Sequence, residues 1–318
     1  MYKRFFELKE NPFNVSPDPR YLFLTKQIEE TLSSLMYGIQ TRKGISALAG
    51  EVGTGKTTLV NRLLDWLHRN AAKTAFLFNS RMNSTQLFDL VLAEFEIHCE
   101  SSSKSRQLIK LNQWLVERFR AGETCVLIID EAQNLTFPVL EEIRMLTNLE
   151  TSKEKLLQIV LSGQPEFEEK LNLPQLRQLR QRIMIRCKTG PLTKEETHAY
   201  ILERLKIAGA VADGQPIFSP AARETIHLFS RGVPRVVNLL CEHALINAYV
   251  EQQRPIQPKI IEEVAREFQL DVVEPTASPE SLRTSAELYN SEAFIQNLGE
   301  VLSRFRISPP SRSARERK

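Results

Sequence analysis

One stretch of the chain has the residue types and spacing of a complete GxxxxGK[ST] loop: Gly50, Glu51, Val52, Gly53, Thr54, Gly55, Lys56 and Thr57. In such a loop the glycines let the backbone wrap a polyphosphate, where a Cβ would clash or φ must be positive. Lys56 can reach the β- and γ-phosphates, and the hydroxyl of Thr57 can bind Mg²⁺. We therefore predict that these residues, with Thr58, bind a nucleoside triphosphate.

The flanks of this loop supply the elements that a working site needs. The apolar run 45–49 precedes it, and Leu59, Leu63 and Leu67 follow it at helical spacing. A strand must deliver the loop, and the next helix must present its N-terminal amides to the anion. Both flanks argue against the alternative, a glycine-rich turn in an unrelated α/β protein.

Two carboxylates, Asp130 and Glu131, end the apolar run 126–129. Both would lie at the carboxyl edge of a parallel sheet, where such sheets bind ligands. Asp130 is predicted to hold Mg²⁺, directly or through water, and Glu131 to polarise the water that attacks the γ-phosphate. The alternative is an acidic turn after a buried strand, which the preceding phosphate loop disfavours.

Other polar residues are weaker candidates for the same site. Gln164 follows the next apolar run, and its amide could contact the γ-phosphate or the attacking water; a satisfied turn residue is the alternative. Arg177, Arg180 and Arg182 precede the fifth run and could reach a neighbouring subunit's γ-phosphate, or form a solvated helix face. Arg235 begins a predicted helix and is expected to contact the nucleotide, the alternative being a surface arginine.

Five apolar runs separated by helical stretches predict an α/β fold with a parallel sheet buried on both faces. The predicted strands cover residues 45–49, 74–79, 124–129, 156–162 and 182–187. A helix is predicted over 25–38, with Gly38 as its cap. From residue 192 onward the pattern is helical throughout, with helices at 193–208, from Ser219-Pro220, at 234–252 and at 258–268.

The bulk composition excludes several classes of protein. The formal net charge of +3 is too small to indicate nucleic-acid binding by itself. The four cysteines are dispersed without a CxxC pair, which is typical of buried thiols in a reducing compartment. No apolar run approaches the ~20 residues needed to cross a bilayer. We therefore expect a cytoplasmic protein without an integral membrane segment.

Together these residues resemble the AAA+ ATPases, and more closely the subfamily of the general secretion pathway ATPases ExeA/GspA and the TniB-like transposition ATPases. The resemblance covers roughly residues 1–268. It is carried by the phosphate loop and by Phe5-Phe6-Glu7-Leu8, Asn11-Pro12-Phe13, Pro17-Asp18-Pro19, Ile129-Asp130-Glu131-Ala132-Gln133-Asn134-Leu135, Gly163-Gln164-Pro165-Glu166, Pro191-Leu192-Thr193, Tyr200-Ile201, Arg204-Leu205, Gly232-Val233-Pro234-Arg235 and Asn238-Leu239-Leu240-Cys241.

The resemblance implies a role for each candidate. Lys56 and Thr57 belong to Walker A, Asp130 and Glu131 to Walker B, Gln164 to the sensor 1 region and Arg235 to sensor 2. Arg182 is preferred to Arg180 as the finger. Pro12 and Phe13 would border the adenine.

The resemblance also implies a P-loop NTPase of the AAA+ type with a five-stranded parallel sheet, followed by a small all-helical lid domain. We predict a lead-in bordering the nucleotide over 1–41, the ATPase core over 42–190, the helical lid over 191–268, and a linker, one amphipathic helix and a basic tail over 269–318. ExeA-type proteins continue into a membrane span and a peptidoglycan-binding module. Neither is expected here, which argues against the cell-wall role.

Three functions are compatible with these features. The first is a Mg²⁺-dependent, homo-oligomeric ATPase, a motor or switch for an envelope assembly such as secretion, pilus or exopolysaccharide export. The second is a DNA-associated ATPase of the transposition-regulator kind, in which the basic tail with Arg304, Arg306, Arg312, Arg315, Arg317 and Lys318 contacts phosphates, unless that tail only aids solubility. The third is a nucleotide-dependent adaptor with negligible hydrolysis, which the pair Asp130-Glu131 disfavours.

Overall fold

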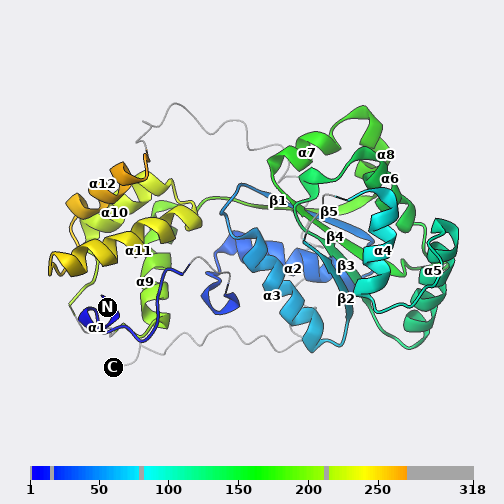
Figure 1. Cartoon of the computed structure of the whole chain (residues 1–318), viewed down its shortest axis with the longest axis horizontal. Helices are drawn as coiled ribbons and strands as arrows, with labels where there is room; N and C mark the ends of the chain where they lie inside the picture. The colour runs from blue at the N-terminus through cyan, green and yellow to red at the C-terminus, as the bar shows by residue number, and fades with distance from the viewer. Residues whose placement is uncertain (1, 15–17, 79–81, 211–214, 271–318) are drawn as a thin grey trace, which may run out of the picture. The chain divides into compact units, whose positions relative to one another are not determined.

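A five-stranded parallel sheet lies at the centre of the part of the chain that carries the GxxxxGK[ST] loop (Figure 1). The computed structural model describes residues 2–14, 18–78, 82–210 and 215–270. The strands are β1 (Ile45–Gly50), β2 (Lys73–Leu77), β3 (Cys125–Ile129), β4 (Leu157–Gly163) and β5 (Ile183–Thr189), in the spatial order β2-β3-β4-β1-β5. All neighbouring strands are parallel, so the predicted sheet is confirmed, although β2 ends earlier and β5 later than predicted.

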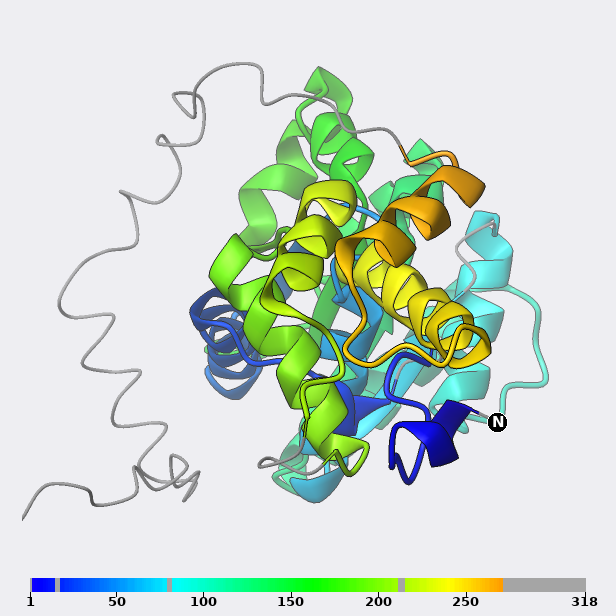
Figure 2. The same cartoon turned by 90° about the vertical axis from the view of Figure 1, so that its left-hand side faces the viewer.

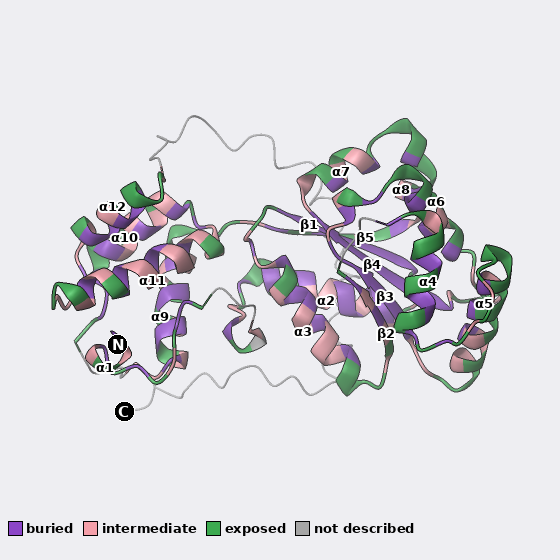
Figure 3. Cartoon of the chain, in the orientation of Figure 1, coloured by how far each residue is buried: buried purple, intermediate pink, exposed green. Residues whose placement is uncertain are grey.

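Both faces of the sheet are covered by helices, which explains why its strands are apolar at successive positions. In β3, Cys125, Leu127 and Ile129 belong to one hydrophobic core, and Val126 and Ile128 belong to another on the opposite face. Figure 3 shows the three inner strands β1, β3 and β4 buried along their length. The flanking helices are α2 (Lys26–Gln40), α3 (Lys56–Arg69), α4 (Ser84–Glu94), α5 (Lys104–Arg120), α6 (Phe137–Leu146), α7 (Pro165–Leu171) and α8 (Arg177–Arg182).

The predicted end of α2 at Gly38 is wrong. Thr25 caps the N-terminus by accepting a 3.2 Å hydrogen bond from the Ile28 N–H, but the helix continues to Gln40. Gly38 is needed for packing, since a Cβ at this position would lie 2.4 Å from Cδ1 of Ile185 on β5. The glycine therefore lets α2 approach the sheet rather than end the helix.

A second group of helices follows the sheet and surrounds its own core: α9 (Lys194–Ile207), α10 (Pro220–Ser230), α11 (Pro234–Val250) and α12 (Pro258–Glu267). Figure 2 looks onto these helices, coloured from yellow-green to orange. The predicted start signals are confirmed: Thr193 and Glu196 form a reciprocal capping box, and Ser219 caps α10 with Pro220 at its first position. The all-helical lid predicted from the sequence is present.

The N-terminal segment contributes to the lid core before it reaches the sheet. Tyr2, Phe6, Leu8 and Phe13, of which Tyr2 lies on the short helix α1 (Tyr2–Phe5), are buried among the lid helices. The Lys9 N–H also donates a 2.8 Å hydrogen bond to the carbonyl of Ala208 at the end of α9. The chain then passes through the 3₁₀ turn η1 (Pro19–Tyr21) into α2.

Residues 1–272 form one compact unit, so the division of this stretch at residues 41/42 and 190/191 stays a prediction. The remaining 3₁₀ turns are η2 (Ala132–Asn134) after β3 and η3 (Pro174–Leu176) before α8. The predicted linker, amphipathic helix and basic tail lie mostly beyond residue 270 and therefore outside the described residues.

Candidate nucleotide site

The phosphate loop connects the end of β1 to the start of α3, as predicted. Gly50 ends the strand, and Gly55 caps the helix in the left-handed conformation with φ of 94°. The hydroxyl of Thr54 fixes the loop between them: it lies 2.8 Å from the Glu51 carbonyl and 2.8 Å from the hydroxyl of Thr189 on β5. The N-terminal amides of α3 therefore open onto a loop that the sheet edge holds in shape.

The side chain of Lys56 is held close to this loop. Its Nζ donates hydrogen bonds of 2.7 Å to the Gly50 carbonyl and 2.9 Å to the Glu51 carbonyl, and only 7% of the residue is exposed. Burial lowers the pKa of Lys56, against the opposing effect of Glu131 and Asp130. A cation is thus concentrated among backbone dipoles at the place where a phosphate chain would lie. Thr57, the next residue, is exposed.

Asp130 and Glu131 follow β3 directly, and their backbones differ. Asp130 is buried, its N–H donates to the Leu77 carbonyl at 2.9 Å, and its Oδ1 accepts from the Glu131 N–H at 3.0 Å. Glu131 has φ of 54° and ψ of 40°, a left-handed conformation that costs a non-glycine residue about 1–3 kcal/mol. Such strain is typical of residues whose side-chain direction matters for function.

The Glu131 carboxylate is contacted by two glutamines. Gln164 Nε2 lies 3.2 Å from Oε2, which brings the predicted sensor residue and the predicted base together. Gln133 Nε2 donates a hydrogen bond to the same oxygen. Gln133 was part of the family resemblance, two residues after Glu131, but it was not predicted as a site residue.

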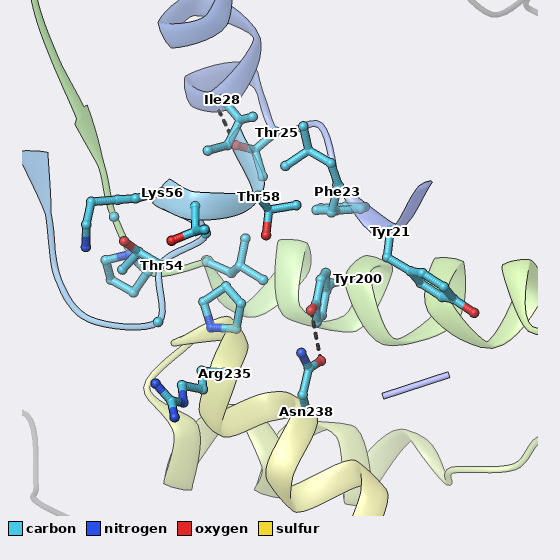
Figure 4. Close-up of a pocket in the computed structure, with 18 of the residues that line it drawn as sticks. Tyr21, Phe23, Thr25, Ile28, Thr54, Lys56, Thr58, Tyr200, Arg235 and Asn238 are labelled. Carbon is cyan, nitrogen blue, oxygen red and sulfur yellow. Dashed lines mark hydrogen bonds between the residues drawn. The ribbon is translucent and has the colours of Figure 1, made fainter. Parts of the chain in front are cut away.

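The loop, the carboxylate and the lid enclose a cavity of about 340 Å³. This volume lies within the range of small-ligand pockets. Figure 4 shows Thr54, Lys56 and Thr58 across from Tyr200, Arg235 and Asn238 of the lid. The lining residues are Asn14, Asp18, Tyr21, Leu22, Phe23, Thr25, Gln27, Ile28, Val52, Gly53, Thr54, Gly55, Lys56, Thr57, Thr58, Glu131, Gln164, Gly190, Pro191, Leu192, Glu196, Tyr200, Arg204, Pro234, Arg235 and Asn238.

The prediction that Pro12 and Phe13 border the nucleotide needs correction. Phe13 is fully buried in the lid core and packs edge-to-face on Phe218, with 6.1 Å between ring centroids. Pro12 is buried as well, and its carbonyl accepts a 2.5 Å hydrogen bond from Nε of Arg204. A large apolar side chain gains more from the lid core than from a half-open pocket. Later residues of the lead-in, among them Tyr21 and Phe23, line the cavity instead.

Arg204, Tyr200 and Asn238 form a hydrogen-bonded chain along the lid wall. Arg204 Nη1 donates to the Tyr200 hydroxyl at 2.7 Å. That hydroxyl donates to Asn238 Oδ1 at 2.8 Å (Figure 4). The Arg204 guanidinium also lies over the ring of Tyr21, 4.4 Å from its centroid. Arg204 and Tyr200 thus join helix α9 to the lead-in and to α11. All three were part of the family resemblance, but none was predicted as a site residue.

Arg235 approaches the phosphate loop from the lid, and its contact with a nucleotide stays a prediction. Its backbone N–H donates to the Gly53 carbonyl at 3.2 Å, and its exposed side chain lines the cavity. The approach is so close that a Cβ on Gly53, which has φ of 84°, would lie 2.7 Å from Cβ of Arg235. The lid and the loop are therefore in direct backbone contact at this point.

The three candidate finger residues lie on α8 and do not line the cavity of their own chain. Arg182 Nη1 contacts Thr147 Oγ1 at 2.5 Å, Asn148 Oδ1 at 2.5 Å and the Arg144 carbonyl at 3.3 Å, so it holds the end of α6. Arg180 is half-buried and donates to Asn172 at 3.1 Å. Arg177 is exposed and makes no hydrogen bond or ion pair within the described part of the chain.

The donor set at the loop fits a magnesium ion bound together with phosphate. The Thr57 hydroxyl and the Asp130 carboxylate are oxygen ligands of the kind that Mg²⁺ prefers, and the remaining positions would fall to phosphate oxygens and water. Among the described residues, no group of three or more His, Cys, Asp or Glu side chains could hold a metal by itself.

Comparison with known proteins identifies the loop-bearing part of the chain. A family model described as "AAA domain" matches residues 39–171. Residues 39–171 thus resemble an AAA domain. The General secretion pathway protein A of Aeromonas hydrophila is 42% identical over 257 residues, which are 80% of this chain and 46% of that relative. The predicted resemblance to the AAA+ and general secretion pathway ATPases is confirmed, and the chain spans less than half of that relative's length.

Solved structures share the fold at low sequence identity. Cdc6p of Pyrobaculum aerophilum is 17% identical with a TM-score of 0.61, over 84% of this chain and 72% of that chain. ORC2 of Aeropyrum pernix, solved as ADPNP-ADP complexes, is 15% identical with a TM-score of 0.59, over 81% and 72%. RuvB of Thermotoga maritima, a Holliday junction branch migration motor, is 18% identical with a TM-score of 0.54, over 81% and 74%. These neighbours confirm the predicted AAA+ type of P-loop fold.

The helices of the described residues were also compared with what a bilayer requires. None of them combines the length and the apolar character needed to cross a membrane.

Proposed function

We propose that this chain binds ATP with Mg²⁺ and hydrolyses it, and that it works as an oligomeric motor or switch for an envelope assembly of the secretion class. The observation that carries the proposal is the single cavity of about 340 Å³ onto which Lys56, Thr57, Glu131 and Gln164 open together. A phosphate cradle and a carboxylate beside it are the parts that phosphoryl transfer to water requires.

Each residue has a distinct task in this reaction. Lys56 and the N-terminal amides of α3 hold the β- and γ-phosphates. Thr57 and Asp130 would hold the Mg²⁺ ion, which would supply positive charge against the phosphates. Glu131 accepts a proton from the water whose oxygen attacks the γ-phosphorus, and the bond to the bridging oxygen breaks to leave ADP. Gln164, bonded to Glu131 at 3.2 Å, orients that water.

The lid connects this chemistry to movement. Arg235 lines the cavity, and its backbone N–H donates a hydrogen bond to the phosphate loop. Loss of the γ-phosphate on hydrolysis would therefore alter the contact between the lid and the loop. The candidate finger arginines of α8 do not line the cavity of their own chain. We infer that a neighbouring subunit supplies a finger, and that Arg180 serves better than Arg182, whose guanidinium already holds α6 through three acceptors.

The assignment to secretion rests on the relative from Aeromonas hydrophila, which is 42% identical over 80% of this chain. It is tested in cells that lack this chain: export of secreted proteins should fall, and return with the wild-type chain but not with Lys56→Ala. Normal export without the chain would refute the secretion role. Duplex-DNA-stimulated turnover that disappears at high salt would favour the DNA-associated alternative.

The hydrolysis is tested with Glu131→Gln, which keeps the shape of the side chain but removes the base. We expect ATP affinity to be retained and kcat to fall about 100-fold or more, because general-base catalysis contributes about that factor. Glu117→Gln, at an exposed position of α5, is the matched control and should leave kcat unchanged. Phosphate release under saturating ATP and Mg²⁺ measures both. Equal turnover in Glu131→Gln and wild type would show that Glu131 is not the base.

A further inference from the structure

The amide of Gln133 lies between two parts of the site that end neighbouring strands. Its Nε2 donates a hydrogen bond to Oε2 of Glu131, after β3. Its Oε1 accepts a 3.0 Å hydrogen bond from the backbone N–H of Gln164, after β4. Since the Gln164 side chain also donates to Oε2 of Glu131, the three residues form a closed set of hydrogen bonds.

Only a side-chain amide of this length satisfies both contacts. Nε2 faces a carboxylate, which accepts, and Oε1 faces a backbone N–H, which donates. A glutamate at this position would place a second carboxylate against Glu131, and an apolar residue of the same length would satisfy neither neighbour. Asparagine is shorter by one methylene and would not span the two strand ends.

The surroundings hold Gln133 in place. Lys170 of α7 donates from Nζ to the Gln133 carbonyl at 2.5 Å and to the Leu135 carbonyl at 2.9 Å. Gly163, the last residue of β4, leaves room for the amide: a Cβ there would lie 3.2 Å from Gln133 Oε1 and 3.0 Å from Cβ of Phe167. The backbone, the strand end and the neighbouring helix therefore fix the amide before any ligand arrives.

We propose that Gln133 is a positioning residue that sets the direction of the Glu131 carboxylate for attack on the γ-phosphate. This role rests on the proposed ATP hydrolysis. Glu131 directly follows β3 and has a left-handed backbone conformation. Its side chain is flexible and needs hydrogen-bond partners to hold the carboxylate in one direction. Gln133 supplies these hydrogen bonds and links the carboxylate to the end of β4. The carboxylate of Glu131 therefore keeps a fixed position relative to Gln164.

The test compares Gln133→Met, which keeps the length but removes both polar groups, with Gln133→Glu, which adds repulsion. We expect kcat to fall about 10- to 100-fold in each, since misplacing a catalytic group by about 1 Å costs up to that factor. KM and the dissociation constant for ATP should stay within about twofold, because Gln133 does not line the cavity. Gln113→Met, on the exposed face of α5, is the control and should match wild type.

A double-mutant cycle separates positioning from a general structural role. In a Glu131→Gln background there is no base to orient, so Gln133→Met should lower kcat by less than about twofold more. If the fold-losses in kcat of the two single variants multiplied in the double variant, the proposal would be overturned. An unchanged kcat in both Gln133 variants, or unfolding of both, would also overturn it. Absence of Mg²⁺-dependent turnover in the wild type would refute the proposed function itself, whereas turnover in the wild type and undiminished turnover in the variants would refute only the role of Gln133.

Discussion

Replacing Gly232 with alanine should separate the lid from its connection to the sheet. The residue has φ of 73°, and a Cβ on it would lie 1.9 Å from the Leu192 carbonyl oxygen, nearer than Cβ atoms approach other atoms. Relief of this clash requires the two segments to separate by about 1 Å. The hydrogen bond from the Leu192 N–H to the Gly232 carbonyl, now 2.8 Å, would then exceed hydrogen-bond length.

The expected loss has two parts. The left-handed conformation costs alanine about 1–2 kcal/mol, and the lost hydrogen bond costs about 0.5–1.5 kcal/mol, so the free energy of unfolding should fall by about 1.5–3.5 kcal/mol. Gly122→Ala is the matched control, because Gly122 has φ of 75° but nothing within 4 Å of its added Cβ. It should show only the first part. The effect of alanine on the unfolded chain is common to both variants and cancels in the comparison.

The two variants should also differ in ATP affinity. Gly232 stands three residues before Arg235, whose N–H bonds the Gly53 carbonyl at 3.2 Å. Displacement of this turn should weaken ATP binding about tenfold, equivalent to 1.4 kcal/mol, whereas Gly122→Ala should leave it unchanged. Urea unfolding followed by circular dichroism and titration with a fluorescent ATP analogue measure the two quantities. Equal stability and equal affinity in both variants would refute the close approach described here.

Three further predictions concern Lys56 and two arginines of α8. Lys56→Ala should abolish binding of a fluorescent ATP analogue while the circular dichroism spectrum stays that of a folded chain; a folded variant with wild-type affinity would contradict the assignment. Arg180→Ala should lose hydrolysis but keep ATP affinity, and mixing it with Glu131→Gln should restore some turnover, since each supplies what the other lacks. Arg182→Ala should instead lower the free energy of unfolding by about 1.5–3 kcal/mol, the contribution of charge-assisted hydrogen bonds. A monomer with full activity at every concentration would exclude the shared site.

The sheet and its loop could be predicted because each depends on local sequence. Continuous apolar runs identify strands covered on both faces, and the Thr193–Glu196 capping box identifies the start of α9. The end of α2 was misplaced for the opposite reason. The need for glycine at position 38 comes from Ile185 on β5, far away in the sequence, so no local pattern contains it.

Contacts between residues that are distant in the sequence also explain why the rest of the site could not be predicted. Nothing near Phe13 indicates that its ring enters the lid core, whose helices begin about 180 residues later. Arg204 appears in the sequence as one more charged residue of a helix, yet only 7% of it is exposed. Gln133 is a polar residue in a turn, and its role depends on the backbone of Gln164, which follows another strand.

The burial of Tyr2, Phe6, Leu8 and Phe13 in the lid core means that the lid is built from two stretches of the chain, with the sheet between them in the sequence. The chain therefore passes between lid and sheet twice, once through the lead-in that includes Tyr21 and once through the segment 190–193. Both passages contribute to the wall of the cavity. With a single linker the lid could swivel in any direction, but two attachments restrict it to rotation about the line that joins them. Binding at the cavity would then be converted into motion along one coordinate, which a mechanical partner could use.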